Sequence, residues 1–262
     1  MILTDRQRQE AAALLRRAEH HAAPIEPLSA LLPGLDLADA YAVQRHNIAR
    51  RQADGATVIG HKIGLTSTAM QQLLGVTEPD FGHLLDDMVH RDGAPVFAHH
   101  YCRPRVEPEI CFRLSHPLRG PGVTGDDVLA ATDAVAPALE IVDSRIRDWN
   151  ITLVDTVADN ASSGGLVHGP WTPLGEAPDL ACVTVRLLVD GEPVASGSGR
   201  DVLGHPAAAV AWLANTLARY DTALEPGQVV LPGAMTTAPF VGAGQKIEAR
   251  FSGLGPVSVT FV

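Results

Sequence analysis

The stretch RPRVEPEICFRL, residues 103–114, decides the fold class, because its apolar side chains recur at every second position. In a β-strand, successive side chains point to opposite faces, so Val106 and Ile110 face one way. Glu107 and Glu109 then share the other face, where their carboxylates repel each other. Either water or a cation must relieve this repulsion. The stretch therefore predicts a strand with either a solvated acidic face or a cation site.

On both sides of this strand, the sequence after residue 56 shows a pattern typical of β-strands. Short apolar runs alternate with turns, and 24 glycines and 19 prolines indicate short, curved strands. Two stretches of helical character, residues 124–135 and 205–220, interrupt the strands. This pattern predicts an α+β domain with a rolled or sandwiched mixed sheet, not a doubly wound βαβ fold. The apolar runs are VIGHKIGL, VEPEICFRL, APALEIV, VTVRLLV, QVVLPGAM, KIEARF and VSVTFV.

The N-terminal part differs, because it reads as helix. Thr4 followed by Gln7 resembles a capping box, and the Ala-, Leu- and Arg-rich sequence continues to His21. A second helix is expected to begin near Asp36 and to end at Gly55. We therefore predict an N-terminal helical region over residues 1–55 and a β-rich catalytic domain over residues 56–262.

Composition limits the classes of partner. The formal net charge of −10 disfavours nucleic acid and anionic membranes. The three cysteines form no C-x-x-C motif, which favours reduced thiols over a disulfide framework or a zinc site. The sequence shows neither a signal peptide nor a run of apolar residues long enough to span a membrane. A cytoplasmic protein is expected.

A third carboxylate lies in an apolar setting. Glu140 belongs to AVAPALEIV, residues 134–142, whose two faces are both expected to be buried. A lone ionised carboxylate there costs several kcal/mol unless it is paired or metal-bound. An ion pair with Arg145, Arg147 or another basic group is the alternative to a metal. Three carboxylates without a Cys/His cluster suit a hard divalent ion such as Mg²⁺ or Mn²⁺.

Three further residues are candidates for chemistry. Lys62 lies in an apolar strand, either as an edge lysine or as an ammonium near a metal, with a lowered pKa suited to proton exchange. Asp80 by default belongs to a turn. Ser162 and Ser163 by default are loop hydroxyls, although the glycines at 164–165 would let a backbone approach a ligand closely.

Taken together, the motifs resemble those of the 2-keto-4-pentenoate (2-hydroxypenta-2,4-dienoate) hydratase family of the fumarylacetoacetate hydrolase superfamily. The similarity extends from about residue 36 to the C-terminus, and the ordered set of motifs is far more specific than any single one. These motifs are GHKIGLTS, GVTEPDFGHL, RPRVEPEI, PALEIVDSRIRDW, VDTVADNASSG and LGHP.

The resemblance implies a sheet core of the fumarylacetoacetase C-terminal-domain type and a site that binds Mg²⁺ or Mn²⁺. It implies an active-site lysine, an acidic residue used in proton transfer and a serine of the DNAS motif. The implied metal ligands are Glu107, Glu109 and Glu140, and the implied catalytic residues are Lys62, Asp80 and Ser162.

The expected reaction is the addition of water to 2-hydroxypenta-2,4-dienoate to give 4-hydroxy-2-oxopentanoate in aromatic meta-cleavage catabolism. The substrate carboxylate and C2 oxygen are expected to chelate the metal. A 4-oxalocrotonate decarboxylase is the nearest alternative, and a hydratase of 2-oxohept-4-ene-1,7-dioate is disfavoured by the short spacing between the SR and DT motifs.

A scaffold that binds metal and a 2-oxoacid without turnover is an alternative of another class. The resemblance also implies a homo-oligomer, with association to another pathway enzyme left open.

Overall fold

The computed structural model describes residues 3–67, 71–72 and 75–262 of the chain. Its N-terminal part is helical, and both predicted helices are confirmed. The Thr4 hydroxyl accepts a hydrogen bond from the backbone N–H of Gln7, whose side chain accepts one from the backbone N–H of Thr4. Asp36 caps the later helix. The helices here are α1 (Asp5–His21), α2 (Leu28–Leu31), which was not predicted, and α3 (Leu37–Ala53).

Eight strands of the described residues form a curved mixed sheet, in the order β2-β1-β11-β5-β6-β7-β3 with β8 beside β6. Two of the pairs, β1 with β11 and β3 with β7, are parallel, and the other pairs are antiparallel. The strands are β1 (Val58–Gly64), β2 (Asp80–Leu85), β3 (Val89–Arg91), β5 (Arg105–Leu114), β6 (Thr132–Val142), β7 (Ser163–His168), β8 (Thr172–Pro173) and β11 (Val229–Leu231).

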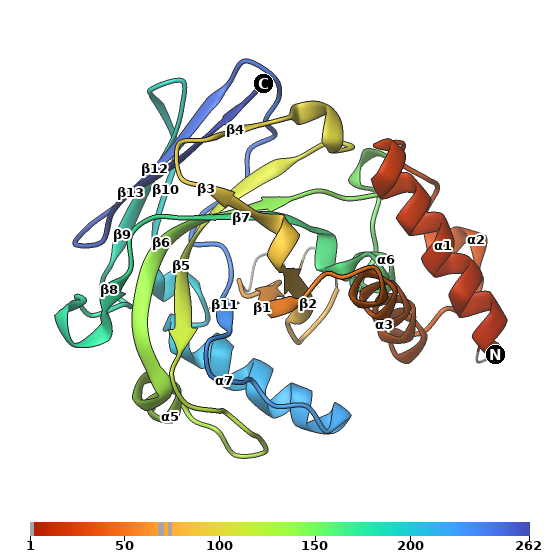
Figure 1. Cartoon of the computed structure of the whole chain (residues 1–262), viewed down its shortest axis with the longest axis horizontal. Coiled ribbons are helices and arrows are strands. Elements are labelled where there is room, and N and C mark those ends of the chain that lie inside the picture. The colour runs from red at the N-terminus through yellow and green to blue at the C-terminus, as the bar shows by residue number, and fades with distance from the viewer. Residues whose placement is uncertain (1–2, 68–70, 73–74) are drawn as a thin grey trace.

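A second sheet of five strands has the order β10-β9-β12-β13-β4. Its strands β12 and β13 pack against β6 of the larger sheet, so the two sheets are stacked over part of their area (Figure 1). The rolled, partly sandwiched mixed sheet and the α+β class are confirmed. The strands are β4 (Pro95–Val96), β9 (Thr184–Val189), β10 (Glu192–Ser198), β12 (Lys246–Phe251) and β13 (Gly255–Phe261).

The remaining helices connect and cover the strands. In Figure 1, α1, α3 and α6 lie together at one side of the larger sheet, and α7 lies below β11. The α-helices are α5 (Gly125–Ala131), α6 (Leu153–Ala158) and α7 (Pro206–Leu217). The 3-10 turns are η1 (Asp86–Met88), η2 (Ala98–His100), η3 (Arg147–Trp149), η4 (Asn160–Ser162), η5 (Leu174–Glu176), η6 (Gly199–Asp201) and η7 (Ala218–Tyr220).

The apolar face of residues 103–114 lies in the main hydrophobic core. Val106, Ile110 and Phe112 are all fully buried there. The same core includes Leu15 of α1 and Val259 of β13, so it extends from the N-terminal helices to the second sheet. The turn between α3 and β1 falls at the boundary expected at residue 55, but an independent N-terminal region stays a prediction.

Two expectations about elements were wrong. The helix expected over residues 124–135 ends at Ala131, and Thr132 already starts β6. The Thr132 hydroxyl donates to the Val128 carbonyl, and the following residues pair with β5, so tertiary pairing outweighs the local helical pattern. The central strands are also longer than expected, with 10 residues in β5 and 11 in β6. None of the helices in the described part of the chain combines the length and apolar character needed to cross a membrane.

Candidate metal centre and active site

The pairing of β5 with β6 gathers three glutamates at the centre of the larger sheet. Glu107 lies directly opposite Glu140 in the antiparallel register, and Glu109 lies two residues further along the same face of β5. Each of the three offers a carboxylate oxygen within 4.8 Å of the others. Glu109 and Glu140 are fully buried and Glu107 is partly buried. The structure thus brings the three sequence-predicted ligands together in one cluster.

The hydrogen bonding of this cluster is incomplete in a way that fits a cation. Both carboxylate oxygens of Glu140 and Oε1 of Glu109 are buried without a hydrogen-bond partner. Oε2 of Glu109 accepts from the backbone N–H of Gly233, 2.7 Å away. A side chain at Gly233 would collide with Thr66, and its φ of 120° favours glycine. Buried oxygens without donors are suitable ligands for a hard divalent ion.

The electrostatics of the cluster lead to the same conclusion. Burial raises the pKa of all three carboxyl groups, and for Glu140 the pKa reaches about 7 although Lys62 lowers it. The neighbouring carboxylates raise the pKa of Glu109 further. Burial thus disfavours three uncompensated carboxylates in this site, and a bound cation would relieve that cost.

Lys62 of β1 is buried against this cluster. Its ammonium Nζ lies 3.4 Å from Oε1 of Glu140 and donates a hydrogen bond of 2.9 Å to the carbonyl of Ala161. Burial lowers the pKa of Lys62, but the surrounding carboxylates, Glu140 foremost, outweigh burial, so the pKa is raised. The expected lowering of this pKa applies to an ammonium beside a bound metal and stays a prediction. The alternative of an edge lysine is also excluded, because the side chain is 4% exposed.

Asp80 is placed beside Lys62 by the hairpin of β1 and β2. It is the first residue of β2, not a turn residue, and it pairs with Gly64. Its Oδ1 is buried without a hydrogen-bond partner. Oδ1 of Asp80 and Nζ of Lys62 both lie within 4 Å of the place that a Cβ on Gly64 would occupy. A glycine at position 64 thus allows the carboxylate and the ammonium to approach each other.

Ser162 lies one residue after the carbonyl that holds Lys62. It is buried in η4, and its hydroxyl lies 3.2 Å from the hydroxyl of Thr156. The adjacent glycines do not form the expected ligand-facing wall, because at position 164 a Cβ would meet Ile141 and Tyr101 and at position 165 it would meet His90. These two glycines accommodate neighbouring protein atoms.

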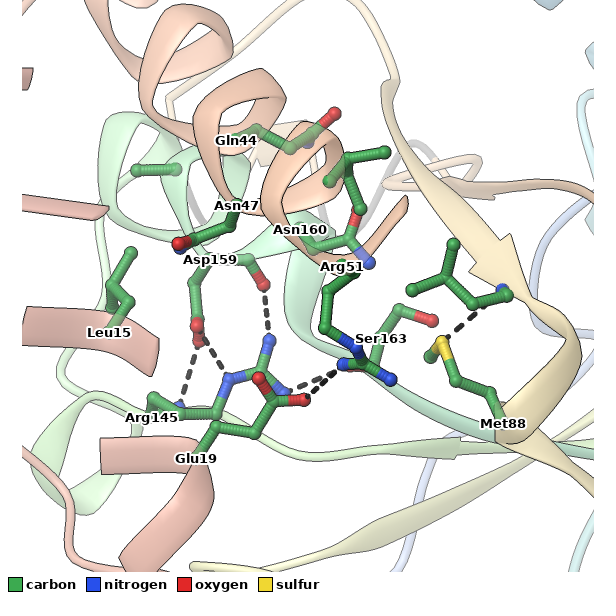
Figure 2. A pocket seen from close by; sticks show the side chains of 13 residues that line it. Leu15, Glu19, Gln44, Asn47, Arg51, Met88, Arg145, Asp159, Asn160 and Ser163 are labelled. Carbon is green, nitrogen blue, oxygen red and sulfur yellow. Dashed lines mark hydrogen bonds and ion pairs between the residues drawn. The ribbon is translucent and has the colours of Figure 1, made fainter. Parts of the chain in front are cut away.

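One part of the site was missed by sequence reasoning. Arg145 and Arg147 were weighed as partners of Glu140, but Arg145 pairs with Asp159 (Nε–Oδ1 2.6 Å) and Arg147 pairs with Glu26. The Arg145 guanidinium also donates to the carbonyl of Ser163, as Figure 2 shows. This buried pair, which we call the Arg145–Asp159 clamp, holds both ends of the turn that carries Ala161. The signal in the sequence was an arginine close behind a fully apolar strand, where it needed a buried carboxylate.

Comparisons with known proteins agree with this architecture. The family model for the fumarylacetoacetate (FAA) hydrolase C-terminal domain matches residues 76–262. The chain is 45% identical over 249 residues to a 2-hydroxyhexa-2,4-dienoate hydratase of Comamonas testosteroni, covering 94% of each protein. It is 46% identical over 261 residues to a 2-keto-4-pentenoate hydratase of Paraburkholderia xenovorans (strain LB400), covering 99% of this chain and 96% of the relative.

A solved structure is similar over the whole chain. It is a 4-oxalocrotonate decarboxylase from Pseudomonas putida G7, complexed with magnesium and adipate, with a TM-score of 0.97 and 37% identity. The match covers 100% of this chain and 99% of the decarboxylase. The rolled sheet, with its acidic cluster and buried lysine, defines an enzyme of the fumarylacetoacetate hydrolase superfamily. Within that superfamily, the chain belongs to the 2-keto-4-pentenoate hydratase family, which confirms the resemblance seen in the motifs.

Proposed function

We propose that the chain is a hydro-lyase that adds water to 2-hydroxypenta-2,4-dienoate and gives 4-hydroxy-2-oxopentanoate. The observation that carries this proposal is the buried lysine in contact with a cluster of three carboxylates, in which both oxygens of Glu140 and Oε1 of Glu109 lack hydrogen-bond donors. Relatives at 45–46% identity over nearly the whole chain are dienoate hydratases, which supports this substrate class.

We propose that Glu107, Glu109 and Glu140 hold a divalent cation, Mg²⁺ first and Mn²⁺ as the alternative. When bound, the ion supplies Lewis-acid stabilisation of negative charge on the substrate C2 oxygen. The all-oxygen ligand set supports a hard cation. Similar decarboxylase structures were solved in complex with magnesium and with calcium, which supports a divalent ion as the cofactor.

The protons are moved, in this proposal, by Lys62 and Asp80. The Lys62 ammonium gives a proton to C5 of the substrate while the enol proton is lost. Water then adds to C4 of the resulting 2-oxo-3-enoate, and a proton is added at C3. The unpartnered carboxylate oxygen of Asp80 is suited to orient and deprotonate that water. Ser162 is proposed to position water or substrate beside the Ala161 carbonyl.

The direct test follows the ultraviolet absorbance of the dienoate mixed with the purified protein, with Mg²⁺ or with a chelator. We expect rapid loss of absorbance that needs the metal, and a product identified by mass spectrometry as the hydroxy-oxoacid. Unchanged decay in the presence of Mg²⁺ would support the scaffold alternative and overturn the proposal. Carbon dioxide released from 4-oxalocrotonate, without hydration of the dienoate, would assign the decarboxylase activity instead.

The setting of the enzyme is part of the proposal. All three cysteines are free, which is typical of a reducing compartment such as the cytoplasm. Phe97 and Val262 are 51% and 47% exposed beside the short edge strand β4, and this apolar edge supports self-association into a homo-oligomer.

A further inference from the structure

Arg105, the first residue of β5, shares a strand face with two of the predicted metal ligands. Side chains two residues apart in a strand point the same way, so Arg105, Glu107 and Glu109 form one row. The carboxylate of Glu107 and the guanidinium of Arg105 influence each other electrostatically. The positively charged side chain of Arg105, which was not among the predicted site residues, therefore stands at the end of this row of acidic side chains.

The guanidinium of Arg105 is held by two aromatic rings. Its Cζ lies 4.0 Å from the ring centre of Phe240 and 4.7 Å from that of Trp149. The segment that carries Phe240 is itself hydrogen-bonded along β5, from the Val106 N–H to the carbonyl of Pro239. The segment that carries the Phe240 ring is thus anchored to the strand, and the guanidinium contacts both rings through cation–π interactions.

The backbone around Trp149 is strained. Trp149 has a φ of 57° and its neighbour Asp148 a φ of 56°, in the left-handed region that residues with a Cβ rarely adopt. The indole N–H donates to the carbonyl of Arg103, 2.9 Å away, and this bond holds the ring in place. Strain of this kind persists where the surrounding structure imposes it, often beside ligands.

The guanidinium of Arg105 lacks an anionic partner of its own. Within residues 3–67, 71–72 and 75–262, no carboxylate forms an ion pair with it and no oxygen accepts a hydrogen bond from it. Its Nε is buried without a partner, while the residue as a whole remains partly exposed. The neighbouring Arg103, which also lies over Phe240, is by contrast paired with Asp148. An oriented, reachable and unpaired guanidinium is suited to a planar carboxylate.

We propose that Arg105, at the end of the acidic row, binds the carboxylate of the substrate through the carboxylate oxygen that is not turned toward the glutamate cluster. This inference rests on the proposed function for the class of substrate, a monocarboxylic 2-oxo or 2-hydroxy acid. Arg105 then fixes the end of the substrate that does not react, while Lys62 and Asp80 act on its carbon chain. The role is one of binding and specificity, because a neutral analogue cannot form the charged pair.

The test measures binding of 2-oxopentanoate, a saturated analogue with one carboxylate, to the Mg²⁺-loaded protein by calorimetry. Arg105→Met removes the charge, Arg105→Lys keeps it without the planar fork, and Arg103→Met serves as the matched control on the same ring. We expect Arg105→Met to weaken binding about tenfold or more, Arg105→Lys to lie between, and Arg103→Met to stay within about twofold. The amide of the same acid is expected to bind wild type and Arg105→Met equally.

Binding of 2-oxopentanoate that is unchanged in Arg105→Met, or undetectable in wild type, overturns the inference. If Arg105→Met does not fold, the Arg105→Lys variant provides the test. Unchanged binding of 2-oxopentanoate by Arg105→Lys would show that the planar guanidinium does not recognise the carboxylate, and would overturn the inference. Arg105-dependent binding by a wild-type protein that does not hydrate the dienoate would overturn the proposed function and keep the inference. Hydration of the dienoate with a KM that Arg105→Met leaves unchanged would keep the proposed function and overturn the inference about Arg105.

Discussion

The Glu140 side chain carries a buried negative charge, and the groups that can compensate this charge become visible only in the structure. In the sequence it is one carboxylate in an apolar run, for which an ion pair is as good a solution as a metal. In the structure it has the ion pair, since Lys62 lies 3.4 Å away, and the carboxylates of Glu107 and Glu109 also lie within 4.8 Å. One ammonium cannot neutralise three carboxylates, so the cluster still requires protons or a cation.

Glu140→Gln is therefore predicted to weaken Mg²⁺ binding by at least about a hundredfold, because even partners outside the ligand shell typically contribute about 10–100-fold. The substitution keeps the shape of the side chain and removes one charged ligand. Calorimetric titration with Mg²⁺ measures the effect, and Glu192→Gln on the exposed strand β10 is the control. Full Mg²⁺ affinity in Glu140→Gln would mean that the cluster is not the metal site.

Lys62→Met separates catalysis from metal binding. We predict a rate of hydration about 10²–10⁴-fold lower, the usual contribution of a general acid–base group. Mg²⁺ binding should be retained or tightened, because the ammonium beside Glu140 repels a second cation. Initial rates and a metal titration on the same sample test both parts. A rate within about threefold of wild type would remove Lys62 from proton transfer.

At the scale of elements, the turn η4 is the least regular part of the site. Asn160, Ala161 and Ser162 all have φ between 50° and 55°, and each such residue costs roughly 1–2 kcal/mol. The Arg145–Asp159 clamp holds one side of the turn. On the other side the Asn160 amide pairs with both backbone groups of His83 in β2. In this conformation the Ala161 carbonyl accepts a hydrogen bond from the Lys62 ammonium, 2.9 Å away.

Asp159→Asn is predicted to destabilise the protein by about 3–5 kcal/mol, since it leaves the buried Arg145 charge without its counter-ion. Hydration should fall as well, because the carbonyl that orients Lys62 is no longer fixed. Urea denaturation and rates on the folded fraction measure the two effects. The control is Glu26→Gln, which breaks the exposed pair with Arg147 and should cost less than about 1 kcal/mol. Equal small losses in both variants would show that the clamp is dispensable.

At the scale of the whole molecule, the stability of the fold and the binding of the ion both depend on the protonation of the glutamate cluster. In the metal-free protein the pKa of Glu140 is raised from 4.5 to about 7, so the folded state binds more protons than the unfolded state in this interval. This group's contribution to stability is thus fully present below about pH 4.5 and is lost as the pH rises through about 7. Mg²⁺ needs the deprotonated carboxylates, so its stabilising effect grows over the same interval.

We therefore predict that the difference in Tm between Mg²⁺-loaded and chelator-treated protein increases from pH 5 to pH 8. At a hundredfold excess of free Mg²⁺ over its Kd, the stabilisation corresponds to about 2.7 kcal/mol. Thermal denaturation with and without metal at each pH isolates this effect, because other titrating groups contribute equally to both samples. A difference that is flat or shrinks with rising pH would contradict the coupling.

Much of the fold was predictable because its signals are local. The caps at Thr4 and Asp36 mark the two long N-terminal helices, and the alternation in residues 103–114 marks the core strand. The helix over residues 124–135 was predicted too long because its last residues pair with β5, and sequence patterns do not show such pairing.

The candidate site was predictable as a set of residue types but not as a geometry. The functional roles of Lys62, Asp80 and Ser162 stay predictions, although the structure places the lysine and the aspartate together. The partner of Arg145, the left-handed turn at Ala161 and the free guanidinium of Arg105 were not predicted. Each depends on contacts between segments far apart in the chain, and side-chain type alone does not specify them.

The sequence by itself determined the alternation in the central strand, the caps of the long N-terminal helices and the burial of the Glu140 carboxylate in an apolar run. These follow from the backbone period of two, from capping hydrogen bonds and from the cost of burying charge. Only the tertiary structure decided that Glu107 lies opposite Glu140 and that Lys62 reaches them from a different strand. Pairing and register between distant strands are set by the packing of the whole core, so the centre exists only in the folded chain.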